Sequence, residues 1–196
     1  EIVNSGEMFA ALRENGSIIS WGDWSFNYNQ LNEGAVEVLD ELMNSNDFVK
    51  IIPSAIYNSF VALRDDGSIF LWGTPNSSSQ DPNTSQELSG EIDVVDIFSN
   101  NYSFAALRED GSVITWGDQN SGGNSSDVGT QINGSIDVKT IYATDSAFAA
   151  LLIDGSVVTW GNSEYGANIQ SVSEELDGRV KVSQIFSNKT SFSALR

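Results

Sequence analysis

The chain has 196 residues, with 27 acidic against 9 basic side chains, a formal net charge of −18, and neither cysteine nor histidine. A surface this acidic repels phosphate backbones, so nucleic acid is not expected as a partner, and no apolar run approaches the roughly 18 to 20 residues that cross a bilayer. Without cysteine or histidine, disulfides, thiolate or imidazole metal sites and a conventional catalytic triad are excluded, which leaves oxygen ligands only.

One phrase recurs along the chain at nearly constant spacing. Four segments match almost position for position, at residues 9–23, 60–74, 104–118 and 148–162, and a fifth copy starts at residues 192–196. The intervals between successive Trp-Gly pairs are 51, 44 and 44 residues. Residues 1–196 are therefore predicted to be a single repeat array with approximate units 1–46, 47–91, 92–135, 136–179 and a partial 180–196.

Each unit is predicted to begin with a strand of β-branched and aromatic residues, as at 94–98, 138–142 and 182–186, and to continue into a tight hairpin. Asp-Gly or Asn-Gly at the tip suggests a two-residue type I′ turn, because both residues tolerate positive φ. Such a turn would place Phe104 and Ala106 on one face with Val113 and Thr115 of the returning arm. The glycines assigned to these turns are Gly16, Gly67, Gly111 and Gly155.

The Trp-Gly pair that ends each hairpin is interpreted as core packing at a fixed position, because every copy has it; a ligand-stacking ladder is the alternative. These structural pairs are Trp21 and Gly22, Trp72 and Gly73, Trp116 and Gly117, and Trp160 and Gly161.

Polar connectors rich in Ser, Asn and Gly follow the hairpins, and the longest lies between Asp23 and Asp47. Its cluster of Trp24, Phe26 and Tyr28 is a candidate partner-binding site. The cluster could equally cover a partly helical stretch predicted at residues 35–43. Tyr165 holds a comparable connector position and is the other candidate partner-binding residue.

These elements predict an all-β fold of tandem three- to four-stranded antiparallel repeats. One such sheet buries too little apolar surface alone, so the sheets must stack as in a β-propeller or solenoid, with a closed ring, an incomplete ring and an open array all possible.

The phrase Ala-Leu-x-x-Asp-Gly-x-Val-x-x-Trp-Gly, preceded by a Val-x-x-Ile strand, resembles the repeat of the regulator of chromosome condensation superfamily, which implies a β-propeller. Residues 99–103 depart from that family's usual phrase because they contain no histidine. The shorter unit is more similar to the bacterial, β-lactamase-inhibiting branch, whose blades have three strands. It also resembles the Asp-Gly-Ser-Val-x-Thr-Trp-Gly arrays of large surface proteins from marine bacteria and cyanobacteria. Guanine-nucleotide exchange is not implied, because the loop residues for it have no counterpart here.

Residues 1–13 align with residues 184–196, so the chain is expected to be a piece of a longer array whose other repeats are among its partners. No cofactor is expected. A calcium site in the oxygen-rich connector at 118–127 is a weak possibility, since the connector lacks the ligand spacing of an EF-hand.

The function predicted from these residues is a non-enzymatic scaffold of an extracellular or cell-surface protein, which binds a protein or glycan or has a structural role. The alternative is a secreted propeller-type inhibitor or adaptor. A hydrolase or lyase on a propeller scaffold is the third hypothesis, and it would need carboxylates from several blades at a central channel.

Overall fold

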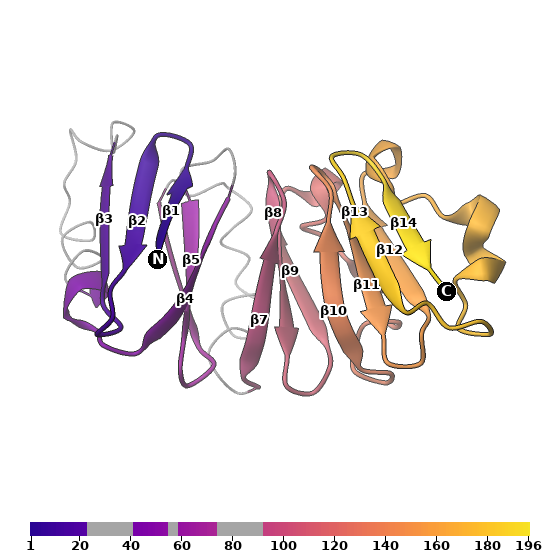
Figure 1. The fold of residues 1–196 in the computed structure, drawn as a ribbon, viewed down its shortest axis with the longest axis horizontal. Helices are drawn as coiled ribbons and strands as arrows, with labels where there is room; N and C mark the ends of the chain where they lie inside the picture. The colour runs from indigo at the N-terminus through magenta and orange to yellow at the C-terminus, as the bar shows by residue number, and fades with distance from the viewer. Residues whose placement is uncertain (23–40, 55–58, 74–91) are drawn as a thin grey trace.

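The computed structural model describes residues 1–22, 41–54, 59–73 and 92–196, which form five antiparallel sheets, called blades 1 to 5 here (Figure 1). The three-stranded blades are β1 (Ile2–Ser5), β2 (Met8–Leu12) and β3 (Ile18–Gly22); β4 (Phe48–Pro53), β5 (Ser59–Arg64) and β6 (Ile69–Gly73); β7 (Val94–Ser99), β8 (Ser103–Arg108) and β9 (Val113–Gly117); and β10 (Val138–Ala143), β11 (Ala147–Leu152) and β12 (Val157–Gly161). Blade 5 pairs β13 (Gln184–Ser187) with β14 (Phe192–Leu195).

The blades stand side by side in a row that does not close into a ring, and the two ends of the chain lie at opposite ends of the row (Figure 1). The first strand of each blade lies beside the first strand of the next. Within the described residues, helical structure is confined to residues 41–44 and four short 3₁₀ segments in the connectors: η2 (Gln119–Ser121), η3 (Ser126–Val128), η4 (Ser163–Tyr165) and η5 (Gln170–Glu175). None of the helices in the described part of the chain is long and apolar enough to cross a membrane.

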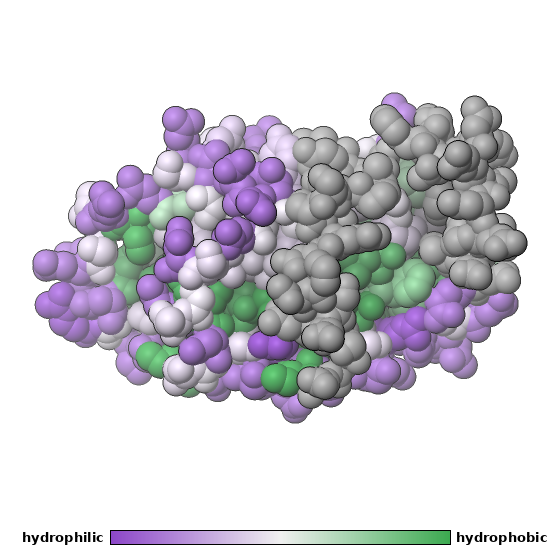
Figure 2. All heavy atoms as spheres, turned by 180° about the vertical axis from the view of Figure 1, so that it is seen from behind, coloured by the Kyte–Doolittle hydropathy of each residue, from purple (hydrophilic) through white to green (hydrophobic). Residues whose placement is uncertain are grey.

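The middle strand of each inner blade is apolar on both faces, because it packs against a blade on either side. In β11, Phe148 and Ala150 face the core shared with blade 3, whereas Ala149 and Leu151 face the core shared with blade 5. This alternation follows the two-residue period of a strand, and the small alanine side chains let neighbouring sheets approach closely. Hydrophilic residues cover most of the described surface in Figure 2, with small hydrophobic patches between them.

The hairpin tips differ from the predicted type I′ turn. The amide of Gly111 donates to the Arg108 carbonyl at 3.0 Å, and the amide of Arg108 donates to the Ser112 carbonyl at 2.9 Å. The loop is therefore three residues long, with Gly111 at its end in the left-handed region at φ +75°. This is the geometry of a turn followed by a glycine bulge, and the same bonds recur at Gly16, Gly67 and Gly155. The two-residue turn was the wrong prediction.

One extra loop residue shifts the strand register by one, and that shift reverses the faces of the returning arm. The prediction that Val113 and Thr115 share a face with Phe104 is therefore wrong. Trp116 lies opposite Phe104 instead. The same pairing stacks a phenylalanine on a tryptophan in each of the first four blades. Ring centroids are 5.7 Å apart for Phe9–Trp21, 5.0 Å for Phe60–Trp72, and 5.4 Å for both Phe104–Trp116 and Phe148–Trp160.

Each hairpin glycine also joins its blade to the next one. The Gly111 carbonyl accepts a hydrogen bond from the Val138 amide at 2.9 Å, at the start of the first strand of blade 4. The approach is so close that a Cβ at Gly111 would lie 2.6 Å from Cα of Asp137. Equivalent bonds run from Phe48 to Gly16 at 3.1 Å, from Val94 to Gly67 at 3.0 Å and from Val182 to Gly155 at 2.9 Å.

The connectors of blades 3 and 4 each pack aliphatic side chains between two blades and accept a hydrogen bond from the start of their own third strand. Ile132 is 1 % exposed, and its carbonyl accepts from the Val113 amide at 2.9 Å. Leu176 accepts from Val157 in the same way at 2.9 Å, and Leu42 is fully buried in the core between blades 1 and 2. In blades 3 and 4 the connector therefore occupies the start of the outer strand's edge, which would otherwise be open to strand pairing.

Candidate functional site

The predicted partner-binding residues are only partly within the described structure. Trp24, Phe26 and Tyr28 fall in residues 23–40, outside the described residues, so their role stays a prediction. Tyr165 ends η4 and is half-buried. Its carbonyl accepts a hydrogen bond from Thr144 Oγ1 at 2.8 Å, which holds the connector against the hairpin of its own blade.

The Trp-Gly pairs lie at equivalent positions at the end of the third strand of blades 1 to 4, and three of the four tryptophans are buried. Trp72, Trp116 and Trp160 are 6 %, 2 % and 4 % exposed, whereas Trp21 is 42 % exposed. The indole Nε1 of Trp160 donates to the Gly122 carbonyl of the preceding connector at 3.1 Å. Buried rings of this kind do not form a ligand-stacking ladder.

The glycines of these pairs adopt a conformation that L side chains rarely take, with φ of +120° at Gly22, +107° at Gly73, +110° at Gly117 and +103° at Gly161. A Cβ at Gly117 would also lie 2.7 Å from Cα of Ser103 on the facing strand. The residue after each tryptophan is therefore held as glycine by backbone contact.

A cleft of about 1070 Å³ opens between the connectors of blades 3 and 4, and we call it the connector cleft. Its lining is dominated by amide and hydroxyl side chains, and Asp127 is the one charged residue among the described residues that line it. In a chain with a net charge of −18, this is a nearly uncharged polar surface with many hydrogen-bond donors and acceptors. The amides on its walls include Gln119, Asn120, Gln131, Asn168 and Gln170.

The two walls of the connector cleft are built alike. Asn124 Oδ1 accepts from the Ser126 amide at 2.9 Å, and Asn168 Oδ1 accepts from the Gln170 amide at 3.1 Å, at the start of η3 and η5 respectively. Thr159 Oγ1 of β12 donates to the Ala167 carbonyl at 2.8 Å, which fixes the second wall to its blade. The cleft is therefore lined by connectors that are themselves anchored.

A second concave surface, of about 600 Å³, lies where the first hairpins of all five blades meet, and we call it the axial rim. Hydrogen bonds cross this rim from each blade to the next. Ser5 Oγ donates to the Ser54 carbonyl, and Ser54 Oγ donates to the Asn101 carbonyl at 3.2 Å. The Asn101 amide donates to the Asp145 carbonyl at 3.3 Å, and the Asp145 amide to the Lys189 carbonyl at 2.9 Å.

The side chain of Asn100 stabilises the axial rim, and this residue was not identified from the sequence. Its Oδ1 accepts from the amides of Tyr102 and Ser103, both at 2.8 Å, and its Nδ2 donates to the Ser121 carbonyl at 2.7 Å. One side chain thus closes the hairpin and holds the connector that follows the blade. The signal in the sequence was a polar residue at the same place in several repeats: Ser5, Asn100, Thr144 and Asn188.

The acidic hairpin tips are turn caps rather than acid–base groups. Hydrogen bonds from the Ser68 hydroxyl and amide lower the pKa of Asp66, and those from Ser156 lower the pKa of Asp154. In the described ranges, no three carboxylates lie close enough together to hold a metal ion.

No protein-family model matches the chain, and no curated protein matches it. Solved structures do. The chain is similar to Prp20p from Saccharomyces cerevisiae, with 20 % identity, a TM-score of 0.56, and coverage of 100 % of this chain and 49 % of that one. It is similar to human WBSCR16, with 17 % identity, a TM-score of 0.54, and coverage of 100 % and 53 %. It is also similar to the CRINKLY WD40 ectodomain of the Arabidopsis thaliana receptor kinase ACR4, with 14 % identity, a TM-score of 0.52, and coverage of 95 % and 56 %.

At these identities the likeness is one of fold, and the chain spans about half the length of the structures it matches. The predicted all-β architecture of stacked antiparallel repeats is confirmed, with three strands in each of blades 1 to 4 and with the described sheets not closed into a ring. The chain has the fold of β-propellers like the regulator of chromosome condensation.

Proposed function

We propose that this chain is part of a non-enzymatic repeat scaffold, outside the cell or at its surface, that binds a partner protein through its connector face. The observation that carries the proposal is the connector cleft, a nearly uncharged polar surface held by anchored connectors. Sheet faces between blades are occupied by packing, so the connectors and the axial rim are the surfaces that can vary without unfolding the array.

Two comparisons support a binding role. Yeast Prp20 has been solved bound to Kap60, and the CRINKLY structure is the ectodomain of a receptor kinase. The high negative charge supports a soluble surface protein in a salty medium. The 44-residue period and three-stranded blades support kinship with the short-repeat bacterial branch and its surface arrays, and attachment to further repeats of the same kind.

A glycan is the second ligand class, and the lining of the connector cleft favours it specifically. Amides and hydroxyls can donate and accept hydrogen bonds to sugar hydroxyls, and a single carboxylate leaves a neutral sugar unrepelled. In the alternative function, a secreted inhibitor or adaptor would bind one enzyme or receptor through the same connector cleft.

The test screens the chain against a library of extracellular proteins and a glycan array. Any ligand found is then measured with two cleft-filling variants, Asn120→Trp and Gln170→Trp, both at exposed positions. Glu109→Trp, at the exposed hairpin tip of blade 3, is the matched control. We expect the cleft variants to weaken binding by about tenfold or more, a change of about 1.4 kcal/mol, with the control unchanged. Ligands that bind all three variants like the wild type would place the function elsewhere.

A further inference from the structure

One edge of the row combines exposed aliphatic side chains with exposed carboxylates, and we call it the tip face. It is the lower edge in Figure 1, where the second strand of each blade turns into the third. Figure 2 shows small hydrophobic patches among hydrophilic residues on this edge. No residue of the tip face lines the connector cleft or the axial rim. The tip face consists of the hairpin tips of blades 2 to 4 at 64–67, 108–111 and 152–155 and of the strand starts at 46–49, 92–95 and 136–139.

Backbone hydrogen bonds make the tip face continuous from blade to blade. The Glu109 amide donates to the Asp93 carbonyl at 2.9 Å, and the Ile153 amide donates to the Asp137 carbonyl at 3.0 Å. These bonds tie each hairpin tip to the strand start of its own blade, while the hairpin glycines tie it to the strand start of the next blade. The tip face is therefore one connected band rather than a set of separate loops.

Aliphatic side chains are exposed on the tip face at positions where the fold accepts charged residues. Ile153 is 59 % exposed, and Glu109 holds the equivalent position in blade 3. Val95 is 51 % exposed in the β-bulge at the start of β7, and Lys139 holds the equivalent position in blade 4. Packing within the array therefore does not require these side chains to be apolar, whereas a contact with another molecule would. The other exposed aliphatic residues of the tip face are Val49 and Ile136.

Negative charge dominates the same band. Its exposed side chains include one base, Lys139, against the six carboxylates of Asp65, Asp66, Asp93, Glu109, Asp110 and Asp137. Arg64 and Arg108 are half-buried and bond to neighbouring side chains. Among the described residues, Asp110 is the one member of the six with a basic group nearby, the Arg108 guanidinium at 3.9 Å. The carboxylates therefore face solvent with little local neutralisation, which favours a positively charged partner.

We propose that the tip face binds a protein segment in which lysine or arginine side chains alternate with aliphatic ones. The basic side chains would lie against the six carboxylates, and the aliphatic ones would cover Val95, Ile136 and Ile153. Exposed bases bound the acidic stretch, at Arg13 in blade 1 and at Lys181 in blade 5, so the site is confined to blades 2 to 4. This surface is separate from the connector cleft, and the proposal does not depend on a ligand there.

The first experiment titrates fluorescently labelled peptides into the whole chain and follows anisotropy at physiological ionic strength. The probe repeats Lys-Ile-Lys-Gly three times, and a second peptide of equal charge has glycine in place of each isoleucine. We expect saturable binding of the probe, about tenfold tighter than that of the second peptide, because only the probe covers the aliphatic side chains. Equal binding of the two peptides would mean counter-ion attraction alone and would overturn the proposal. Failure of the probe to bind would overturn it as well.

The second experiment locates the site with single substitutions at exposed positions. Ile153→Ser should weaken binding of the probe by about fivefold, and Glu109→Gln by about threefold. Val172→Ser, at a 44 % exposed valine of η5, and Glu164→Gln, on η4, are the matched controls and should bind like the wild type. Urea midpoints equal to that of the wild type show that each variant is folded. Controls that weaken binding as much as the tip-face variants would place the peptide elsewhere and contradict the proposal.

Discussion

Blades 1 and 4 contain the same phrase and the same stacked pair, yet the environments of these pairs differ. Ring centroids are 5.7 Å apart in Phe9–Trp21 and 5.4 Å apart in Phe148–Trp160. Trp21 is 42 % exposed and Trp160 is 4 % exposed, because the Trp160 side of blade 4 packs on blade 3, whereas no described blade covers the Trp21 side of blade 1. The repeat sequence sets the pair locally, and the neighbouring blade supplies the burial.

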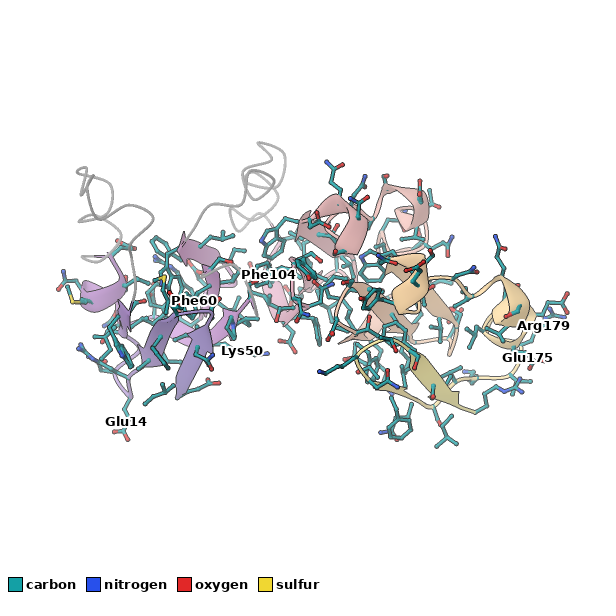
Figure 3. All side chains as sticks on the ribbon, turned by 90° about the horizontal axis from the view of Figure 1, so that it is seen from above. Glu14, Lys50, Phe60, Phe104, Glu175 and Arg179 are labelled. Carbon is teal, nitrogen blue, oxygen red and sulfur yellow. The ribbon has the colours of Figure 1, made fainter. Side chains whose placement is uncertain are left out.

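This difference is what a quasi-one-dimensional array predicts, since each repeat contacts only its neighbours and much of its stability lies in the interfaces. In Figure 3, Phe60 and Phe104 lie within the row of blades, whereas Glu14 and Arg179 lie at its periphery. Substitutions at equivalent positions should therefore differ in effect according to what covers them.

The largest expected effect is at the tryptophans. Trp160→Ala should lower the free energy of unfolding by about 3–5 kcal/mol, because it empties a site between two blades and removes the hydrogen bond to Gly122. Trp21→Ala should cost about 1 kcal/mol, the value of an exposed aromatic pair. Urea denaturation of both variants measures the difference. Equal costs would mean that blade 1 is covered in solution.

Next come the glycines with positive φ. Gly111→Ala should destabilise by about 2–4 kcal/mol, because strain in the left-handed region is added to a backbone collision with Asp137. Gly178→Ala has a similar φ of +85°, but its Cβ would meet nothing closer than 3.4 Å, so strain alone should cost about 1 kcal/mol. Thermal melting compares the two. A similar loss at both sites would contradict the close joint between blades 3 and 4.

A smaller effect separates the two hairpin asparagines. Asn100→Ala should cost about 2 kcal/mol, because it leaves two amides and a connector carbonyl with fewer partners in a buried site. Asn188 closes the hairpin of blade 5 with the same side-chain oxygen but is exposed, so Asn188→Ala should cost about 1 kcal/mol or less. Hydrogen exchange should also rise in residues 119–123 of the Asn100 variant only.

The smallest expected effect is on how the stability of the fold changes at acidic pH. Serine hydrogen bonds lower the pKa of Asp66 and Asp154 in the folded chain, so each carboxylate stabilises the fold above its ordinary pKa near 4, and this contribution disappears as the pH falls below it. In blade 1, Asn15 accepts the same bonds from Ser17 without a charge. The double variant Asp66→Asn and Asp154→Asn should therefore lose less stability than the wild type between about pH 4 and pH 2. Urea midpoints across that range test this, and parallel curves would contradict it.

The sequence was sufficient for the stacked antiparallel repeats and the fold, because hydrophobic alternation and period are local signals that recur in every copy. It left three or four strands per blade open, and the described blades 1 to 4 have three. It was insufficient for the hairpin register. Asp-Gly suits both a two-residue turn and a three-residue loop that ends in glycine. A difference of one loop residue decides whether Val113 or Trp116 is on the same face of the sheet as Phe104. The contacts between connectors and blades could not be predicted either, since Ile132 lies in a mostly polar connector and the acceptor of the Asn100 side-chain amide is 21 residues away.

At each step along the axial rim a group of one blade donates to a carbonyl of the next, and between blades 1 and 2 a bond also runs back from the Ser59 amide to Ser5 Oγ at 3.1 Å. The row therefore has a head and a tail that cannot be exchanged. A pull on the two ends would load the contacts between successive blades in series, so the weakest of these contacts, with its rim bond, glycine bond and packed side chains together, would set the force at which the row separates.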